Sequence, residues 1–165
     1  MKRNQGFTLV ELIIVIVILG ILAVTAAPRF LNLAGDAKGE TLQAVKASLQ
    51  SANSIINAKA IIQGVQTSAT ANVNESGTLI PVVYGHVEAL ASAVTAVLDL
   101  DGNFVVAQGV ANTDLGMTAD NVMIYPTGST PPTTTTTTAQ ACVLIYTEAA
   151  SATTKPTYAF ETDGC

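Results

Sequence analysis

The sequence predicts an α+β protein in which one long N-terminal α-helix packs on a C-terminal head built around an antiparallel β-sheet. Three observations support this prediction. An apolar run near the N-terminus continues into an amphipathic helical pattern, and short segments rich in Val, Ile and Thr then alternate with turn-forming residues. A long helix followed by a series of strands is typical of the α+β class, in which helix and sheet come from separate parts of the chain.

The first element is the apolar run from Phe7 to Ala27, in which Glu11 is the single charged residue. As an α-helix with a rise of ~1.5 Å per residue, this run spans ~32 Å, close to the hydrocarbon thickness of a bilayer. Lys2 and Arg3 precede it, and the positive-inside tendency keeps such residues in the cytoplasm. The run therefore predicts a transmembrane segment, with the C-terminal bulk of the chain outside the inner membrane.

Glu11 separates this prediction from two simpler ones. A secretory signal peptide has a shorter apolar core, of roughly 7 to 15 residues, and a plain membrane anchor gives no reason for a carboxylate. A carboxylate near the centre of a bilayer costs on the order of 2.5–3.5 kcal/mol, so it tends to have a partner. No cation lies within helical reach on the apolar side. Glu11 therefore has no partner, or its partner lies in residues 1–6 or on another molecule. The alternative is that the Glu11 side chain snorkels to the lipid headgroups.

The helical pattern resumes after Pro28, which cannot donate a backbone hydrogen bond and so predicts a kink. We expect the helix to end near Gly64, because glycine is a common helix terminator, so the whole helix covers 7–64. Apolar residues recur on one face at helical spacing and predict the side that packs on the head: Leu42, Val45, Leu49, Ala52 and Ile56. Polar residues lie mostly off this stripe: Lys46, Gln50, Asn53 and Asn57.

The head covers residues 65–165 and is predicted to contain one short helix and several strands. Residues 67–77 are small and polar and predict a loop, residues 79–84 predict a short strand, and residues 87–98 predict a helix. Four further segments are rich in strand-forming residues and are separated by turn formers, namely 104–111, 121–125, 141–147 and 157–162.

Charge and motifs exclude several functions. From Ile61 onward Lys155 is the only basic residue among many acids, so the head has no basic surface for nucleic acid. His86 is the single histidine and has no nucleophile or metal-ligand partner by spacing. The segment Asp99–Asn103 lacks the ligand order of a calcium loop and predicts a turn. We therefore expect no enzyme, no metal site and no cofactor.

The N-terminus resembles the type III signal of type IV pilins and pseudopilins. The resemblance rests on the basic leader, the long apolar run and one heptapeptide, Gly6-Phe7-Thr8-Leu9-Val10-Glu11-Leu12. It implies that a membrane prepilin peptidase and N-methyltransferase removes the leader 1–6 by cleavage between Gly6 and Phe7, and methylates the new Phe7 amine. It also implies that Glu11 pairs with the Phe7 amine of a neighbouring subunit. An α-amine titrates near ~8, so it is largely cationic at neutral pH.

The resemblance further implies a homo-oligomeric helical filament whose core is the helix 7–27. The subunit would wait in the inner membrane with its head in the periplasm, until the pilus assembly machinery adds it to an extracellular pilus. Pro28 matches the family, and in related filaments the stretch corresponding to Gly20–Pro28 is often melted into extended chain. Melting of this stretch is a hypothesis for the assembled state.

Within the family, the chain looks most like a mannose-sensitive haemagglutinin (MSHA)-type major pilin, through residues 25–33 and the paired C-terminal cysteines. The function implied is a structural subunit of a pilus used for surface adhesion and biofilm attachment, with surface glycans as candidate partners. The alternatives are a minor pilin or a type II secretion pseudopilin. A membrane-anchored periplasmic enzyme or lectin is a rival from another class.

Two features of the head remain. Cys142 and Cys165 are free thiols in a reducing compartment or one disulfide in an oxidising one. The pilin resemblance implies the disulfide, which closes a C-terminal loop that pseudopilins usually lack. The run Thr133–Thr138 follows two prolines and predicts a mobile exposed loop, with O-glycosylation as the sharper hypothesis.

Overall fold

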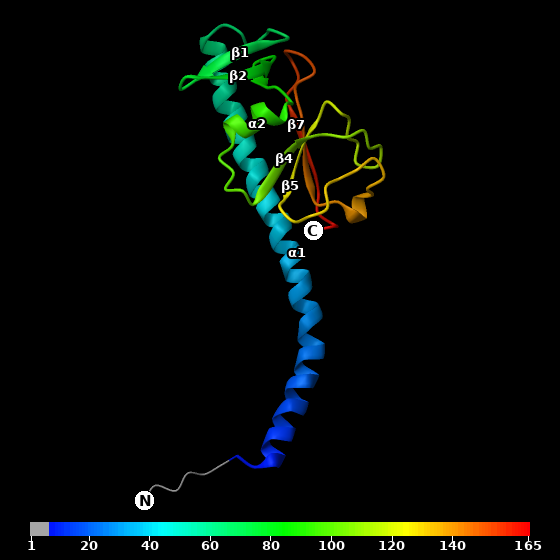
Figure 1. Cartoon of the computed structure of the whole chain (residues 1–165). Coiled ribbons are helices and arrows are strands. Elements are labelled where there is room, and N and C mark those ends of the chain that lie inside the picture. The colour runs from blue at the N-terminus through cyan, green and yellow to red at the C-terminus, as the bar shows by residue number, and fades with distance from the viewer. Residues whose placement is uncertain (1–6) are drawn as a thin grey trace, which may run out of the picture. The chain divides into compact units, whose positions relative to one another are not determined.

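The computed structural model describes residues 7–165, apart from the side chains of residues 27–32. Helix α1 (Leu9–Ile62) precedes a head that combines a short helix with two antiparallel sheets (Figure 1). The predicted α+β class is therefore confirmed. The chain divides into two compact units, residues 1–35 and residues 36–165, and the C-terminal half of α1 belongs to the second unit.

Helix α1 ends at Ile62, two residues before Gly64. Gly64 adopts a positive φ of 72°, and its N–H donates to the carbonyl of Ile61. The N–H of Val65 donates to the carbonyl of Ala60. This pair of bonds is a Schellman motif, in which a left-handed residue lets the chain satisfy the last helical carbonyls. Glycine takes this conformation without steric cost, so Gly64 fixes the end of the helix.

The first sheet has the order β1-β2-β3, formed by β1 (Ala71–Glu75), β2 (Thr78–Val83) and β3 (His86–Val87). The prediction of a loop over 67–77 is wrong, because residues 71–75 pair with β2. Val73 is the one buried residue of β1, so the strand has little apolar character of its own. Ser76 and Gly77 both have positive φ, which is the geometry of a two-residue hairpin turn.

Helix α2 (Ala91–Val97) is shorter than the predicted helix over 87–98. Val87 pairs with Val82 across β2 and β3, so its backbone is extended and cannot be helical. Leu90 is also extended and stands immediately before the helix. Strand pairing therefore replaces the first helical turn that the apolar pattern predicts. In the helix that remains, Ala93 and Val94 are the buried residues.

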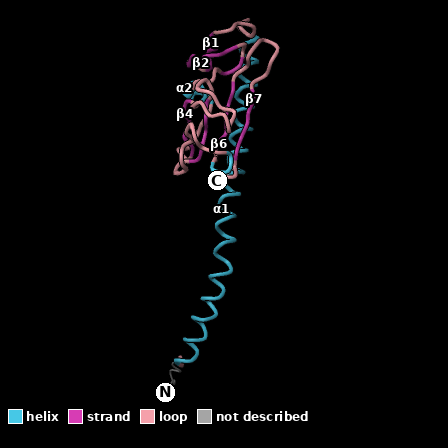
Figure 2. The backbone as a smooth tube through the Cα atoms, turned by 90° about the vertical axis from the view of Figure 1, so that its right-hand side faces the viewer, coloured by secondary structure: helices cyan, strands magenta, loops and turns pink. Residues whose placement is uncertain are grey.

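The second sheet has the order β4-β5-β6-β7 and is antiparallel throughout, which confirms the four predicted strands. They are β4 (Phe104–Gln108), β5 (Val122–Pro126), β6 (Val143–Thr147) and β7 (Thr157–Glu161). Figure 2 shows these strands beside the C-terminal half of α1. The Lys46 ammonium nitrogen lies 4.7 Å from the centre of the Phe160 ring on β7. Such a contact between a cation and an aromatic face is attractive.

The central strands β5 and β6 are buried on both faces, because the sheet separates two apolar clusters. The larger cluster joins the predicted helical stripe to the head, and Leu42, Val45, Leu49 and Ile56 all lie in it. Ala52 is only partly buried. The smaller cluster lies under the loops on the other side of the sheet and includes Leu115, Met117 and Tyr125. The chain therefore covers the outer face of its own sheet with its loops.

Asn112 organises that loop layer. Its side chain is buried, and its amide donates to the main-chain carbonyls of Thr133 (2.6 Å) and Thr136 (2.8 Å). Pro132, next to the threonine run, is also buried. A capping box between Thr137 and Gln140 closes the segment. The run predicted to be a mobile loop is thus tied to the head by hydrogen bonds through its backbone.

Asn53 joins α1 to both sheets. Its amide donates to the hydroxyls of Tyr146 on β6 (3.0 Å) and Tyr158 on β7 (2.9 Å), and its Oδ1 accepts from the N–H of Val87 on β3 at 2.8 Å. The Tyr146 hydroxyl donates in turn to the carbonyl of Val87. Burial raises the pKa of both tyrosines, so both stay protonated. The expectation that Asn53 lies off the packed face is wrong: it is 3% exposed.

Candidate functional site

The N-terminal part of α1 presents apolar side chains on every side. From Phe7 to Val24 the large apolar residues are between 47% and 89% exposed within the chain. The stretch Leu9–Ala26 is long and apolar enough to cross a membrane, and none of it is buried against the rest of the chain. A helix that is apolar all round needs a nonaqueous surrounding, either lipid or other helices. This segment is therefore the part of the described chain that calls for a partner or a bilayer.

Glu11 lies in the first turn of this helix and closes a capping box with Thr8. The Glu11 Oε2 accepts hydrogen bonds from the Thr8 N–H (2.8 Å) and the Thr8 hydroxyl (2.8 Å). The N–H of Glu11 donates back to the Thr8 hydroxyl at 3.2 Å. The two residues thus satisfy donors that the start of a helix leaves without intrahelical partners. The Glu11 Oε1 takes no part in these bonds and can still accept a hydrogen bond or pair with a cation.

The sequence carries a local signal for this cap. A threonine followed three residues later by a glutamate, just before an apolar run, is the pattern of a capping box. Thr8 and Glu11 fit that pattern. Thr8 is therefore a candidate functional residue that sequence reasoning missed, and Glu11 has a hydrogen-bonding partner within its own chain.

The other predicted N-terminal residues differ in how far the structure describes them. Phe7 is described and is 89% exposed, whereas Gly6 and the leader 1–6 lie outside the described residues. The backbone of Gly20–Pro28 is helical in the isolated chain, and the side chain of Pro28 is among those not described. The Thr25 hydroxyl donates to the carbonyls of Ile21 and Leu22 within this stretch. A kink at Pro28 and melting in a filament stay predictions.

The two cysteines are joined in the structure. Cys142 and Cys165 form a disulfide whose Cα atoms are 4.7 Å apart, and it links the end of the described chain to the residue before β6. The Gly164 N–H donates to the Ala141 carbonyl at 2.9 Å. A Cβ on Gly164 would lie 2.2 Å from the Gln140 carbonyl carbon, so only glycine allows this approach. The C-terminal segment is therefore held by a covalent link and by a close backbone contact.

Side chains of the types that ligate metals do not cluster in the described part of the chain. Within residues 7–165, no group of three or more His, Cys, Asp and Glu side chains is placed to hold a metal ion. Gly102, in the segment Asp99–Asn103, has a positive φ of 76°, and its carbonyl accepts a hydrogen bond from the Thr127 hydroxyl. That geometry is a turn.

Comparison with known proteins finds a family motif at the N-terminus and a similarity to a pilus component. A family model described as the prokaryotic N-terminal methylation motif matches residues 1–27, which include Gly6, Phe7 and Glu11. The chain is also 41% identical over 75 residues to the "Type IV narrow pilus major component PilA5" of Thermus thermophilus. This match covers 46% of the chain and 63% of that relative, less than two thirds of its length. No solved structure matches the chain significantly.

These findings agree with the geometry of the N-terminal segment. The matched motif contains the apolar segment Leu9–Ala26 and the capped Glu11, and the relative is named as a major component of a type IV narrow pilus. The similarity to MSHA-type pilins in particular is not confirmed. The chain carries a prokaryotic N-terminal methylation motif on a long apolar helix, and over nearly half its length it is similar to a type IV pilus major component.

Proposed function

We propose that this protein is a structural subunit of an extracellular type IV pilus and not an enzyme. The observation that carries the proposal is the fully unburied apolar helix Leu9–Ala26, which lies within the matched methylation motif and has a capped carboxylate in its first turn. A helix of this kind is stable in a bilayer, and it is equally stable among copies of itself in the core of a filament. The protein would use the two environments in turn.

Processing comes first. A prepilin peptidase cleaves between Gly6 and Phe7, which removes Lys2 and Arg3 with the leader, and methylates the new amine. Phe7 is exposed and precedes the first turn of α1, so the new N-terminus would stand at the end of the helix and not within it. The subunit then remains in the inner membrane through the span 7–27, with the head in the periplasm, an oxidising compartment in which the Cys142–Cys165 disulfide is stable.

Assembly follows when the pilus machinery transfers the helix from lipid to the filament. The capping box directs one oxygen of Glu11 toward Thr8 and leaves Oε1 for a cation on another copy. The methylated Phe7 amine of a neighbouring subunit supplies that cation. Bringing a carboxylate and an amine together in an apolar core offsets part of the desolvation of each, whereas an unpaired charge there is strongly unfavourable. The pair would therefore set the register between subunits.

The finer assignment is an MSHA-type major pilin that serves surface adhesion and biofilm attachment, with surface glycans among its partners. The disulfide at the C-terminus favours a pilus subunit over a type II secretion pseudopilin. A minor pilin is the remaining alternative, and the abundance of the protein in the filament separates it from a major one.

The test is mass spectrometry and N-terminal sequencing of the protein recovered from sheared cell surfaces. The expected chain begins at Phe7, carries one additional methyl group and contains the oxidised Cys142–Cys165 pair. If the chain still begins at Met1, or is found only in the membrane fraction, the proposal is wrong and the protein is an anchored periplasmic protein.

A further inference from the structure

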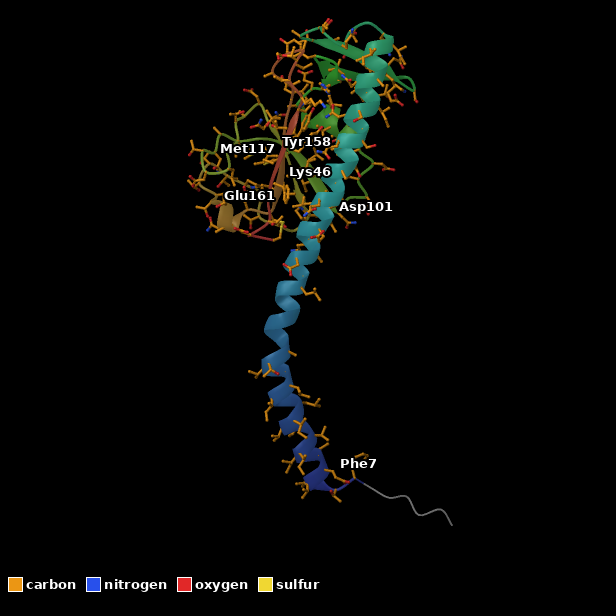
Figure 3. All side chains as sticks on the ribbon, turned by 180° about the vertical axis from the view of Figure 1, so that it is seen from behind. Phe7, Lys46, Asp101, Met117, Tyr158 and Glu161 are labelled. Carbon is orange, nitrogen blue, oxygen red and sulfur yellow. A yellow bond between two sulfur atoms is a disulfide. The ribbon has the colours of Figure 1, made fainter. Side chains whose placement is uncertain are left out.

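Two adjoining cavities lie beside the C-terminal half of α1, within the unit 36–165. Both are lined by Asn57, His86 and Lys155, and we call the two together the Lys155 groove. Both are open to solvent; the first has a volume of about 390 Å³ and reaches Tyr158, and the second has a volume of about 270 Å³ and reaches Gln66. In Figure 3, Tyr158 lies where the strands of the head meet α1. The groove has the size of a small-ligand site, which is typically ~300–1,000 Å³.

The charge of the groove differs from that of the rest of the head. Lys155 is the only basic residue after position 60, and neither cavity is lined by Asp or Glu. Lys155 forms no salt bridge with any residue of the described range 7–165. His86 adds no positive charge at neutral pH, because burial and then the charge of Lys155 lower its pKa. The groove thus presents one unpaired cation on an acidic head.

Several polar atoms of the groove have unused hydrogen-bonding capacity. In the described part of the chain, His86 Nδ1 and Gln66 Oε1 are the buried side-chain atoms without a hydrogen-bond partner. The Tyr158 hydroxyl accepts from Asn53, and its own hydrogen has no acceptor among the described residues. His86 Nδ1 and Gln66 Oε1 have almost no exposed surface, so among these atoms the Tyr158 hydroxyl on the wall of the first cavity is the one whose hydrogen a ligand oxygen can accept.

The walls of the groove are fixed by contacts that do not involve a ligand. Asn53 holds Tyr158 through the hydrogen bond already described. Asn57 donates to the Gly85 carbonyl at 3.1 Å, and the backbone of Gly85 approaches Gln66 so closely that a Cβ there would lie 2.9 Å from the Gln66 Cα. Because these contacts hold Tyr158 and Asn57 in place before binding, a ligand would not have to order those two side chains.

We propose that the Lys155 groove binds an acidic saccharide, with the carboxylate of a uronic acid on Lys155. A carboxylate supplies the missing partner of the ammonium group. Amide and hydroxyl groups both donate and accept, as sugar hydroxyls do, and Tyr158, Gln66 and Asn57 provide such groups along the groove. A neutral sugar leaves Lys155 unmatched, and a small inorganic anion leaves the amides unused. This inference goes beyond the filament proposal and does not depend on it.

The test is an NMR titration of the full-length, unassembled chain in detergent micelles with trigalacturonate. We expect shifts of the backbone amide signals of residues 86 and 155, and a defined Kd. Lys155→Gln should weaken binding by about tenfold or more, because it removes a charge-assisted hydrogen bond. Tyr158→Phe should weaken it while keeping the ring. Lys38→Gln is the matched control, because Lys38 is an exposed lysine of α1 outside the groove.

Neutral maltotriose and sodium acetate complete the experiment. Binding of trigalacturonate at least about tenfold tighter than either supports the proposal. Equal affinity for acetate would show a simple anion site, and equal affinity for maltotriose would show that Lys155 selects nothing. Shifts at these residues that grow with protein concentration, without saccharide, would identify a carboxylate of a second copy as the occupant. Each of these results, or no shift at all, overturns the proposal. None of them bears on processing or assembly.

Discussion

The side-chain amide of Asn53 on α1 donates a hydrogen bond of 3.0 Å to the hydroxyl of Tyr146 on β6. The same amide reaches Tyr158, and its oxygen accepts from Val87, so one residue joins the helix to both sheets. A buried polar group with all its partners specifies one arrangement of the elements around it, because any other leaves a polar atom unpaired.

Replacing Asn53 by alanine should lower the free energy of unfolding by about 3 kcal/mol, since it leaves buried partners unpaired and opens a cavity. Denaturant unfolding of the full-length chain in detergent, followed by circular dichroism, measures the change. Gln43→Ala is the matched control, because Gln43 is an exposed residue of the same helix. If the two variants unfold alike, the hydrogen-bond network does not stabilise the head.

Glu11→Gln should separate helix capping from charge pairing. Glutamine can still cap the helix through its carbonyl oxygen, but it cannot pair with an amine cation. We expect normal cleavage and a yield of surface filament reduced by about tenfold or more, because the proposed ion pair with the Phe7 amine would lose one partner. Immunoblots of sheared and membrane fractions measure this, with Glu40→Gln as the control. Normal filament yield from Glu11→Gln would leave capping as the whole role of Glu11.

Gly85→Ala should destabilise the head more than Gly102→Ala does. Both glycines have nearly the same positive φ, 77° and 76°, so both substitutions carry the same backbone strain of about 1–2 kcal/mol. Only Gly85 also meets a neighbour, the Cα of Gln66, and that overlap should add about 1–3 kcal/mol. Denaturation midpoints of the two variants give the comparison. Equal losses would mean that the contact between Gly85 and Gln66 yields without cost.

Removing the disulfide by the double substitution Cys142→Ser and Cys165→Ser should cost about 3 kcal/mol of stability. The two cysteines are 23 residues apart, and the link restricts the unfolded chain over that loop. Denaturation of the wild type with and without reductant provides an independent check. The reduced wild type and the double variant should have the same midpoint, and an unchanged midpoint in both would contradict the prediction.

The stability of the head should fall between pH 7.5 and pH 5.5 through His86. Burial first, and the charge of Lys155 second, lower the pKa of His86 below its ordinary value of 6.5. The unfolded chain therefore takes up a proton before the folded chain does, so acidification through this range favours unfolding. In His86→Gln this part of the pH dependence should disappear. Unfolding midpoints at the two pH values test it, and an equal slope for both proteins would exclude His86.

Elements with a strong hydrophobic pattern could be predicted from the sequence, whereas a strand that forms only by pairing with its neighbour could not. The apolar run, the helical stripe and the four strands of the second sheet each carry their own hydrophobic signal. Strand β1 exists because β2 pairs with it, and its Asn and Glu residues give little local preference for a strand. The Ser76-Gly77 pair was the one local signal for this hairpin.

The candidate site divides in the same way. Glu11 stands out because a carboxylate is rare in an apolar run, and Phe7 is implied only by the resemblance to the type IV pilin signal. Thr8 gains its role only from the cap that it forms with Glu11. Asn53 looks like a surface residue by spacing, and its burial depends on two tyrosines far along the chain. The groove at Lys155 joins α1, the hairpin at His86 and the segment before β7, and no short motif encodes such a meeting.

The side-chain amide of Asn112 donates its two hydrogen bonds to main-chain carbonyls of the threonine run and not to its side chains. Every residue type has a carbonyl, so substitutions in Thr133–Thr136 leave those two bonds available. The Thr136 hydroxyl accepts a hydrogen bond from the Thr133 N–H at 2.9 Å and so helps to shape the loop. Thr134 is exposed, and its side chain can be exchanged without removing any of these bonds. In this loop, the hydrogen bonds from Asn112 that fix the backbone are therefore separate from the exposed side chain on the surface. Evolution can change that surface side chain here without refolding the subunit.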